Sequence, residues 1–300
     1  ALGGHTGARA EEQETEIALS MRKEEDSSFQ QFLCNIQVGF ADAVSDAMDV
    51  AQVYSVTREA KVAAKMGLRA GWSLDICTVD EEGNPWDSTQ VKMRNKVVKK
   101  LIADKPLLPI GSPPCTDWSS LMNLDWHRMD PDSVAERKRI ARIHLEFCAK
   151  LYRTQHEAGR CFTHEHPKAA TSWHEGVVKE LCNNEGVLTV IADQCEFGLR
   201  SLGPLSRGPA QKPTRFMTNS PCIAQSMDRK CPNRMTHSKR HHDHVHLMNG
   251  RAKASRTYPK ALCRAICRGL VEQIQADRAG QFVIAGLRPG EDSDSGNRII

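Results

Sequence analysis

The central part of this sequence alternates between short apolar runs and longer segments with helical spacing, and this alternation constrains the fold more than any other feature. Runs typical of strands cover residues 50–55, 72–77, 107–110, 161–164 and 187–192, and helical segments are expected at 58–66, 90–104, 131–156 and from 172 onward. Strands that alternate with helices imply right-handed crossovers and a sheet covered on both faces. We therefore predict an α/β fold with a doubly wound, mostly parallel sheet.

Polar side chains follow four of the predicted strands, namely Tyr54-Ser55, Asp75, Pro113-Pro114-Cys115 and Glu165. In a parallel sheet the carboxyl ends of the strands meet at one edge, where ligands bind. The sequence therefore predicts a functional site at that edge.

Cys115 is the first candidate for chemistry at this edge. Two prolines before it exclude a helix and stiffen the chain just beyond a strand. A thiol held in this way is a candidate nucleophile. A buried, inert cysteine in a proline turn is the alternative.

The order of the motifs resembles that of the cytosine-5 DNA methyltransferases. The resemblance covers roughly residues 50–275 and is carried by four pieces in order. These are Pro113-Pro114-Cys115 with Trp118-Ser119 as the nucleophile loop, Glu165-His166-Pro167 as the Glu-Asn-Val strand end, Phe197-Gly198 leading to Gln211–Arg215 as the Gln-x-Arg-x-Arg strand, and residues 258–266 as the last helix. The segment also looks similar to parts of mobile-element polyproteins.

The resemblance implies a Rossmann-like methyltransferase fold that binds S-adenosylmethionine and acts on nucleic acid. Cys115 would attack carbon 6 of cytosine, Glu165 would act as the acid at ring nitrogen 3, and Arg215 and Lys212 would favour the thiolate. The residues expected to line the cofactor site are Tyr54, Ser55, Asp75, Asp87 and Pro113. The family's glycine-rich loop after the first strand is missing, because residues 53–59 contain no glycine. This departure keeps a divergent or inactive relative open as an interpretation.

Positive charge gathers between Arg207 and Arg256, where eleven Lys or Arg stand against two Asp, a net charge of 11 − 2 = +9. A basic stretch beside a cleft favours a nucleic-acid partner, and a solvated basic loop is the alternative. We predict that Lys212 contacts a phosphate and that Arg215 points into the pocket of Cys115.

The same stretch is rich in histidine and cysteine. Zinc binds four thiolate or imidazole ligands in a tetrahedron. We predict a zinc site formed by Cys231, His242 and His244, with either Cys195 or Cys222 as the fourth ligand. A metal-free, His-rich loop is the alternative.

Five segments follow from these patterns. They are an acidic lead-in (1–28), the α/β core (29–206), a small basic His/Cys-rich insert (207–257), a helix that returns to the core (258–280) and a polar tail (281–300). The first residue is Ala1 rather than Met, so a fragment of a longer chain is expected.

Three functions remain open: a cytosine-5 methyltransferase, a non-catalytic nucleic-acid-binding module of a mobile-element polyprotein, and a zinc-stabilised domain. The eleven cysteines are scattered without a Cys-x-x-Cys pair, and no secretory start or membrane-spanning run is evident. These features favour reduced thiols in an intracellular protein, and the nucleus is one candidate compartment.

Overall fold

A central sheet of six strands organises the computed structural model, which describes residues 48–55, 58–120, 122–203, 206–234, 242–247 and 255–280. The strand order is β2-β1-β3-β4-β8-β5. The bounds are β1 (Val50–Val53), β2 (Ala70–Leu74), β3 (Leu108–Gly111), β4 (Thr163–Pro167), β5 (Leu188–Asp193) and β8 (Pro213–Thr218).

The sheet is mostly parallel, as predicted. Strands β2, β1, β3 and β4 pair in parallel, whereas β8 lies antiparallel between β4 and β5. A second sheet has three strands, β6 (Arg200–Gly203), β7 (Ser206–Gln211) and β9 (Val245–His246); the chain passes through β6 and β7 before β8 and adds β9 after it. The sequence pattern did not predict the reversed direction of β8.

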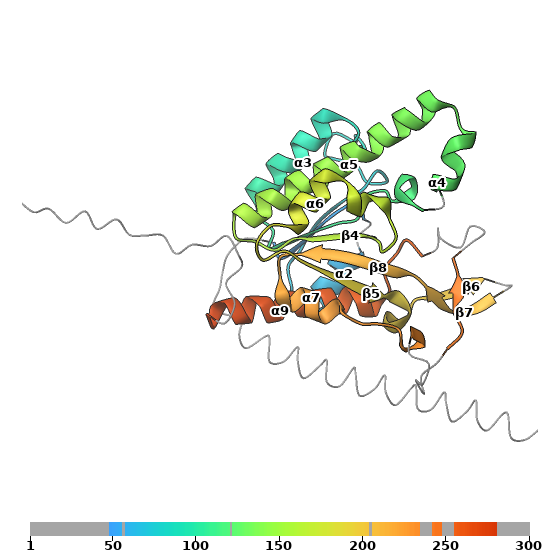
Figure 1. Cartoon of the computed structure of the whole chain (residues 1–300). Helices are drawn as coiled ribbons and strands as arrows, with labels where there is room; N and C mark the ends of the chain where they lie inside the picture. Colours follow the sequence, from blue (N-terminus) through green and yellow to red (C-terminus); the bar gives the residue numbers. More distant parts are fainter. Residues whose placement is uncertain are drawn as a thin grey trace, which may run out of the picture. The chain divides into compact units, whose positions relative to one another are not determined.

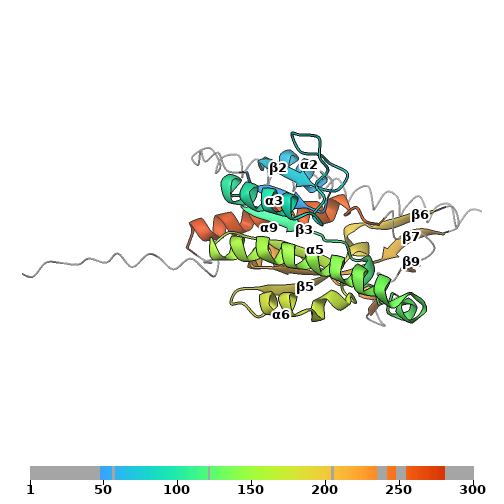
Figure 2. The same cartoon turned by 90° about the horizontal axis from the view of Figure 1, so that it is seen from above.

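Helices cover both faces of the central sheet (Figures 1 and 2). One face carries α3 (Val91–Asp104), α5 (Pro131–Glu157) and α6 (Gly176–Cys182), and the other carries α2 (Arg58–Lys65), α7 (Pro221–Met227) and α9 (Lys260–Arg278). Short elements complete the described chain: α4 (Met122–Asp125) and the 3-10 turns η1 (Thr116–Trp118), η2 (Trp126–Arg128), η3 (Thr171–His174), η4 (Gln194–Phe197) and η5 (Pro232–Arg234). This doubly wound arrangement is consistent with a Rossmann-like fold.

Two helix starts show how local chemistry sets the boundaries. Asp130 caps α5, because its carboxylate accepts a hydrogen bond from the amide of Ser133 at 2.8 Å and Pro131 follows it. The α-helix predicted from Ser172 begins instead at Gly176. The Ser172 hydroxyl lies 2.6 Å from Nδ1 of His166, so its side chain is used there rather than as a cap.

The strand order changes direction at β1, because β2 lies on one side of it and β3 on the other. The ends of β1 and β3 therefore form a topological switch point, the usual place for a ligand in an open α/β sheet. Side chains that follow β1, β2, β3 and β4 all belong to this edge.

The boundary predicted for the basic insert is corrected by the sheet. Strand β8 and helix α7 lie within residues 207–257, yet β8 belongs to the central sheet and α7 packs against α9. The core therefore extends to Met227. The predicted lead-in (1–28) and tail (281–300) lie outside the described residues.

The ten cysteines within the described residues are free thiols. In the same part of the chain, no helix is both long enough and apolar enough to cross a membrane.

Candidate active site

Cys115 and Glu165 belong to neighbouring parallel strands, as predicted. β3 and β4 pair with Ile110 opposite Thr163, and the loop that carries Cys115 leaves the carboxyl end of β3. The Cys115 thiol is half-buried, and Glu165 is only 7% exposed. Burial is the main cause of the raised pKa of the Cys115 thiol, and Glu165 lies near enough for its charge to raise that pKa further.

His166 ties the cysteine loop to the strand of Glu165. Its Nε2 donates a hydrogen bond to the Pro113 carbonyl at 3.0 Å, and its Nδ1 accepts one from the Ser172 hydroxyl at 2.6 Å. Burial lowers the pKa of His166 to about 4, so the ring is neutral at pH 7. Sequence reasoning missed this role, although His166 stands inside the motif that identified Glu165.

Tyr258 contacts Glu165 and also lies beside Ser112 and Lys212. The Tyr258 hydroxyl donates a hydrogen bond to Glu165, and Oγ of Ser112 lies 2.8 Å from the Tyr258 hydroxyl oxygen. The Lys212 ammonium donates to the Ser255 carbonyl at 3.0 Å and lies 6.0 Å from the centre of the Tyr258 ring. Sequence analysis had assigned Tyr258 only to the start of the last helix, because nothing local shows that α9 brings it to the sheet edge.

Burial dominates the electrostatics of this pocket. It raises the pKa of the Glu165 carboxyl, against the opposing effects of Lys212 and of the Tyr258 hydrogen bond. Burial also raises the pKa of the Cys115 thiol, Glu165 adds to the rise, and Lys212 and Arg256 oppose it. A carboxyl group whose pKa is raised by burial therefore lies near a thiol, and such a pair suits proton transfer by the carboxyl and bond formation by the sulfur.

Substitutions around the thiol are expected to move its pKa in opposite directions. Glu165→Gln removes a negative charge and lowers the pKa of Cys115, whereas Lys212→Ala removes a positive charge and raises it. The pH dependence of iodoacetamide alkylation, followed at the Cys115 peptide by mass spectrometry, measures both shifts. The same pH profile in the wild type and both variants would show that these charges do not act on Cys115.

Arg215 does not join this pocket, which corrects the prediction. It lies opposite His166 in the β4–β8 ladder, whereas Phe216 lies opposite Glu165. Successive residues of a strand point to opposite faces, so Arg215 and Glu165 are on different sides of the sheet. The Arg215 guanidinium lies 4.5 Å from the centre of the Trp173 ring and donates to Thr189. Lys212 instead takes the position near the thiol that was predicted for Arg215.

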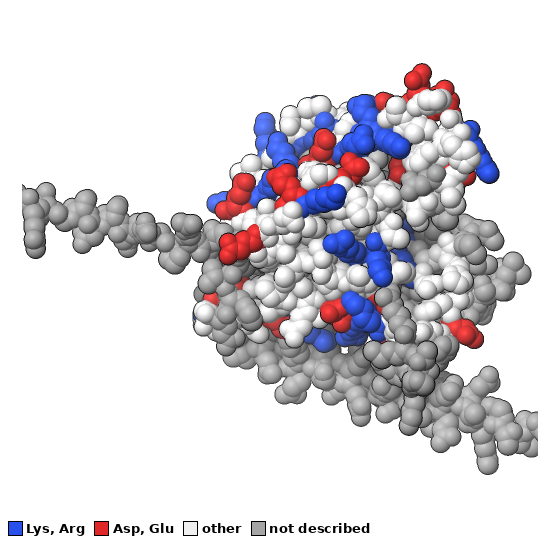
Figure 3. Space-filling model, in the orientation of Figure 1, with Lys and Arg blue, Asp and Glu red and all other residues white. Residues whose placement is uncertain are grey.

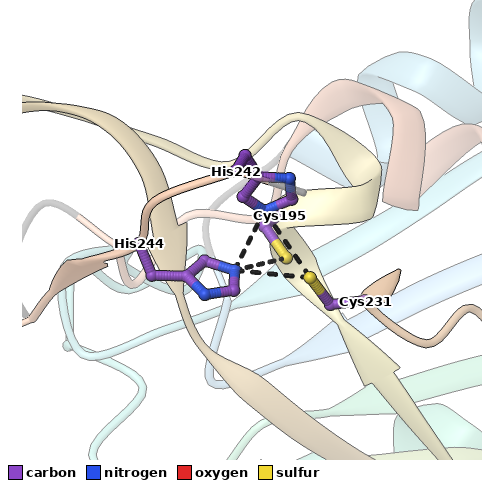
Figure 4. A group of neighbouring side chains, drawn as sticks. All are labelled: Cys195, Cys231, His242 and His244. Carbon is purple, nitrogen blue, oxygen red and sulfur yellow. Dashed lines mark hydrogen bonds between the residues drawn. The ribbon is translucent and has the colours of Figure 1, made fainter. Parts of the chain in front are cut away.

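Four of the five predicted zinc ligands come together in a second cluster, and Figure 4 shows their side chains pointing toward one another. Cys195, Cys231, His242 and His244 each offer one ligand atom, and these atoms all lie within 4.8 Å of one another. Cys222 is not among them. It is buried in α7, where its amide donates to the Gln273 side chain of α9, so the choice between Cys195 and Cys222 falls to Cys195.

The residues predicted to hold S-adenosylmethionine lie around the switch point. Tyr54 has a φ of 63° at the end of β1, a left-handed conformation that favours glycine. Its hydroxyl and Nδ1 of His144 are 2.9 Å apart, and its ring packs edge-on against Phe147. Ser55 follows it and accepts a hydrogen bond from the Gln52 amide at 2.9 Å.

The two predicted carboxylates stand in turns. Asp75, directly after β2, is half-buried and accepts a hydrogen bond from the amide of Cys77 at 2.9 Å. Asp87, in the loop before α3, accepts hydrogen bonds from Thr89 and Gln90. The carbonyl of Pro113, at the end of β3, is the one bound by His166.

No protein-family model matches this sequence, and no curated protein does. Among solved structures, the fold is similar to the methyltransferase EhMeth of Entamoeba histolytica, at 14% sequence identity and a TM-score of 0.34. The match covers 58% of this chain and 53% of the other, so this chain spans about half the length of that structure. At this similarity the geometry of the site has to carry any functional assignment.

Proposed function

We propose that this chain binds an unstacked pyrimidine of a nucleic acid at the Cys115–Glu165 pocket and modifies it by cytosine-5 methyltransferase chemistry. The observation that carries the proposal is that a half-buried thiol and a buried carboxyl lie at the carboxyl ends of two neighbouring parallel strands, β3 and β4. A base reaches such a pocket only after it has left the stack.

The proposed chemistry uses Cys115 as the nucleophile and Glu165, whose pKa is raised by burial, as the acid. Cys115 loses its thiol proton to water, and Sγ then forms a bond to carbon 6 of the base. The electron pairs of the C5=C6 and C4=N3 bonds shift to C4=C5 and to N3, and Glu165 gives its proton to N3. The result is an Sγ–C6 bond, a carboxylate at Glu165 and a nucleophilic carbon 5.

Lys212 supports both steps. Its ammonium group favours the thiolate before the addition and the Glu165 carboxylate after it. His166 keeps the loop of Cys115 against β4 and stays neutral, so it adds no charge that would compete for the thiolate.

The donor set fits the nucleoside half of S-adenosylmethionine. A carboxylate after the second strand binds ribose hydroxyls in related folds, and Asp75 holds that place. Tyr54 supplies the left-handed turn after β1 but adds a side chain where the family has glycine, so binding is expected to depend on Asp75 and Asp87. When bound, the cofactor would supply an electrophilic methyl group for carbon 5.

Calorimetry with S-adenosylhomocysteine tests this part without any turnover. We expect binding to the wild type and at least a tenfold weaker affinity in Asp75→Ala, with Asp132→Ala, on the first turn of the distant helix α5, as the control. Equal affinity in both variants would remove Asp75 from the cofactor site.

The base-binding step is tested separately with a single-stranded oligonucleotide that carries 2-pyrimidinone in place of one cytosine. This ring lacks the 4-amino group and accepts a thiolate without a methyl donor. We expect a covalent adduct that survives denaturing electrophoresis and maps to Cys115. Cys115→Ser should form none, whereas Cys182→Ser, which alters another half-buried thiol, should react like the wild type. Binding without an adduct, or an adduct at another cysteine, would refute the catalytic proposal.

A second candidate is a nucleic-acid-binding module that performs no chemistry, such as one from a mobile-element polyprotein. A cavity of about 400 Å³ at the edge strand β5 favours it, since Lys168, Arg215 and Lys230 line it together with Asp228. Figure 3, which views the molecule from the β5 edge of the sheet, shows Lys and Arg side chains gathered near the middle of this view. Clustered positive charge of this kind suits a phosphate backbone.

For this second candidate we propose that Arg215 and Lys168 contact phosphates, in place of the Lys212 contact predicted from sequence. Arg215→Ala and Lys168→Ala should each reduce the slope of log affinity against log salt by about 1, because each loses a phosphate contact. Lys212→Ala should leave the slope unchanged, since its ammonium group is held inside the pocket by the Ser255 carbonyl. Fluorescence anisotropy between about 50 and 200 mM salt measures the slopes. A change confined to Lys212→Ala would restore the assignment made from sequence.

A further inference from the structure

The cluster of Cys195, Cys231, His242 and His244 joins segments that are far apart in the sequence. Cys195 lies in η4 directly after β5, Cys231 follows α7, and the two histidines precede β9. The distances are 3.6 Å from Cys231 Sγ to His242 Nε2, 3.5 Å from Cys231 Sγ to His244 Nε2, 3.3 Å from Cys195 Sγ to His244 Nε2, and 3.0 Å between the two Nε2 atoms.

Hydrogen bonding alone does not account for these contacts. His244 Nε2 lies within 3.5 Å of three other ligand atoms at once. A neutral imidazole nitrogen carries either one hydrogen or one lone pair, so it can satisfy only one of the three. The distances between these atoms instead resemble those between neighbouring ligand atoms around one tetrahedral metal ion. Zinc bonds of about 2.3 Å to sulfur and about 2.0–2.1 Å to nitrogen give tetrahedral edges of about 3.6 Å between S and N and about 3.4 Å between two N atoms.

The backbone around the ligands is held in place by neighbouring side chains. The amide of Cys231 donates to the Asp193 carboxylate at 2.8 Å. The Asn233 side chain pairs with the backbone of His242 in both directions, since its oxygen accepts from the His242 amide at 2.9 Å and its amide donates to the His242 carbonyl. Such supporting contacts orient the ligands of a metal site before the metal binds.

We propose that Cys195, Cys231, His242 and His244 bind one zinc ion in a closed, structural site. Two thiolates and two imidazoles complete a tetrahedron and leave no position for water or substrate, which distinguishes a structural from a catalytic zinc site. The metal would connect residues 242–244 and the chain after α7 to η4. These segments are mainly polar, so they have no apolar core of their own to hold them together.

The site also borders the turn that carries Lys212. The amide of Gln194, next to Cys195, donates to the Lys212 carbonyl at 3.2 Å. A cavity of about 270 Å³ is lined by Cys195, Cys231 and His244 on one side and by Lys212 and Pro213 on the other. Metal binding would therefore stabilise this turn whether or not the pocket of Cys115 is catalytic.

Metal analysis of the full chain tests the proposal. Chain purified under reducing conditions should contain about one zinc per molecule by inductively coupled plasma mass spectrometry. After removal of zinc, added Co²⁺ should give the visible bands of tetrahedral cobalt and a thiolate charge-transfer band, and Zn²⁺ should abolish both. A chain that yields no zinc and no tetrahedral cobalt spectrum would overturn the proposal.

Single substitutions identify the ligands. Cys195→Ser, Cys231→Ser and His244→Ala should each lose metal, whereas Cys222→Ser, a buried cysteine outside the cluster, should keep it. His244→Cys should still bind cobalt, with a stronger charge-transfer band from the third thiolate, which separates loss of a ligand from failure to fold. Metal lost in Cys222→Ser but kept in Cys195→Ser would refute this ligand set.

Discussion

Replacing Glu165 by glutamine is expected to slow the addition of Cys115 to a 2-pyrimidinone oligonucleotide by about 10²- to 10⁴-fold, the usual contribution of a positioned general acid. Glutamine keeps the shape of the side chain and its hydrogen bonds but has no proton to give to N3. Where Glu165 is ionised, the substitution also removes a negative charge near the thiol, so at such pH values it should lower the pKa of Cys115 and speed its alkylation by iodoacetamide.

These two rates separate an acid from a residue that only supports the fold. A structural defect would slow both reactions, whereas loss of the acid slows the first and speeds the second. Glu175→Gln, which alters a carboxylate paired with Arg142 on the surface, is the matched control and should leave both rates unchanged. Equal adduct rates in Glu165→Gln and the wild type would exclude Glu165 as the acid.

Removing zinc should lower the midpoint of thermal unfolding by roughly 8–16 °C. A ligand present at a thousand times its dissociation constant stabilises the folded state by about 4 kcal/mol. For a chain of about this size, each kcal/mol corresponds to about 2–4 °C in the midpoint. Differential scanning calorimetry with and without a chelator, in the presence of a reductant, measures the change.

The ligand variants supply the control for this shift. Cys231→Ser should unfold at the same temperature with and without chelator, because it has no metal to lose. Cys222→Ser should show the full chelator effect. A wild-type chain that melts identically in both conditions would contradict a structural metal.

Several features of the fold could be predicted from sequence because they depend on local spacing. Apolar runs of four to six residues separated by helical patterns predicted the strands β1 to β5 and the doubly wound arrangement. The Asp130-Pro131 pair predicted the start of α5 for the same reason, since a cap and its helix are neighbours in the chain. Ser172 shows the limit of such signals. Its hydroxyl forms a hydrogen bond with His166, six residues earlier, and does not cap a helix.

Most candidate residues of the two sites could be identified from the sequence. Which of them come together in space could not. Cys115 and Glu165 follow predicted strands, and Cys231, His242 and His244 stand in one short stretch. The choice of Cys195 over Cys222 depended on where α7 packs. Cys222 is turned toward α9, while Cys195 sits in the turn after β5 beside Asp193.

By itself, the sequence determined the order of strands and helices along the chain and the residue types available at the strand ends. Only the tertiary structure decided which of those residues meet. The antiparallel insertion of β8 set the register in which Phe216, not Arg215, faces Glu165, and so sent Arg215 to the opposite side of the sheet. The return of α9 brought Tyr258 to the same carboxyl. Spacing along a chain reports on residues within a few turns of one another, whereas contacts across 50 to 150 residues depend on strand order and register, which no local pattern encodes.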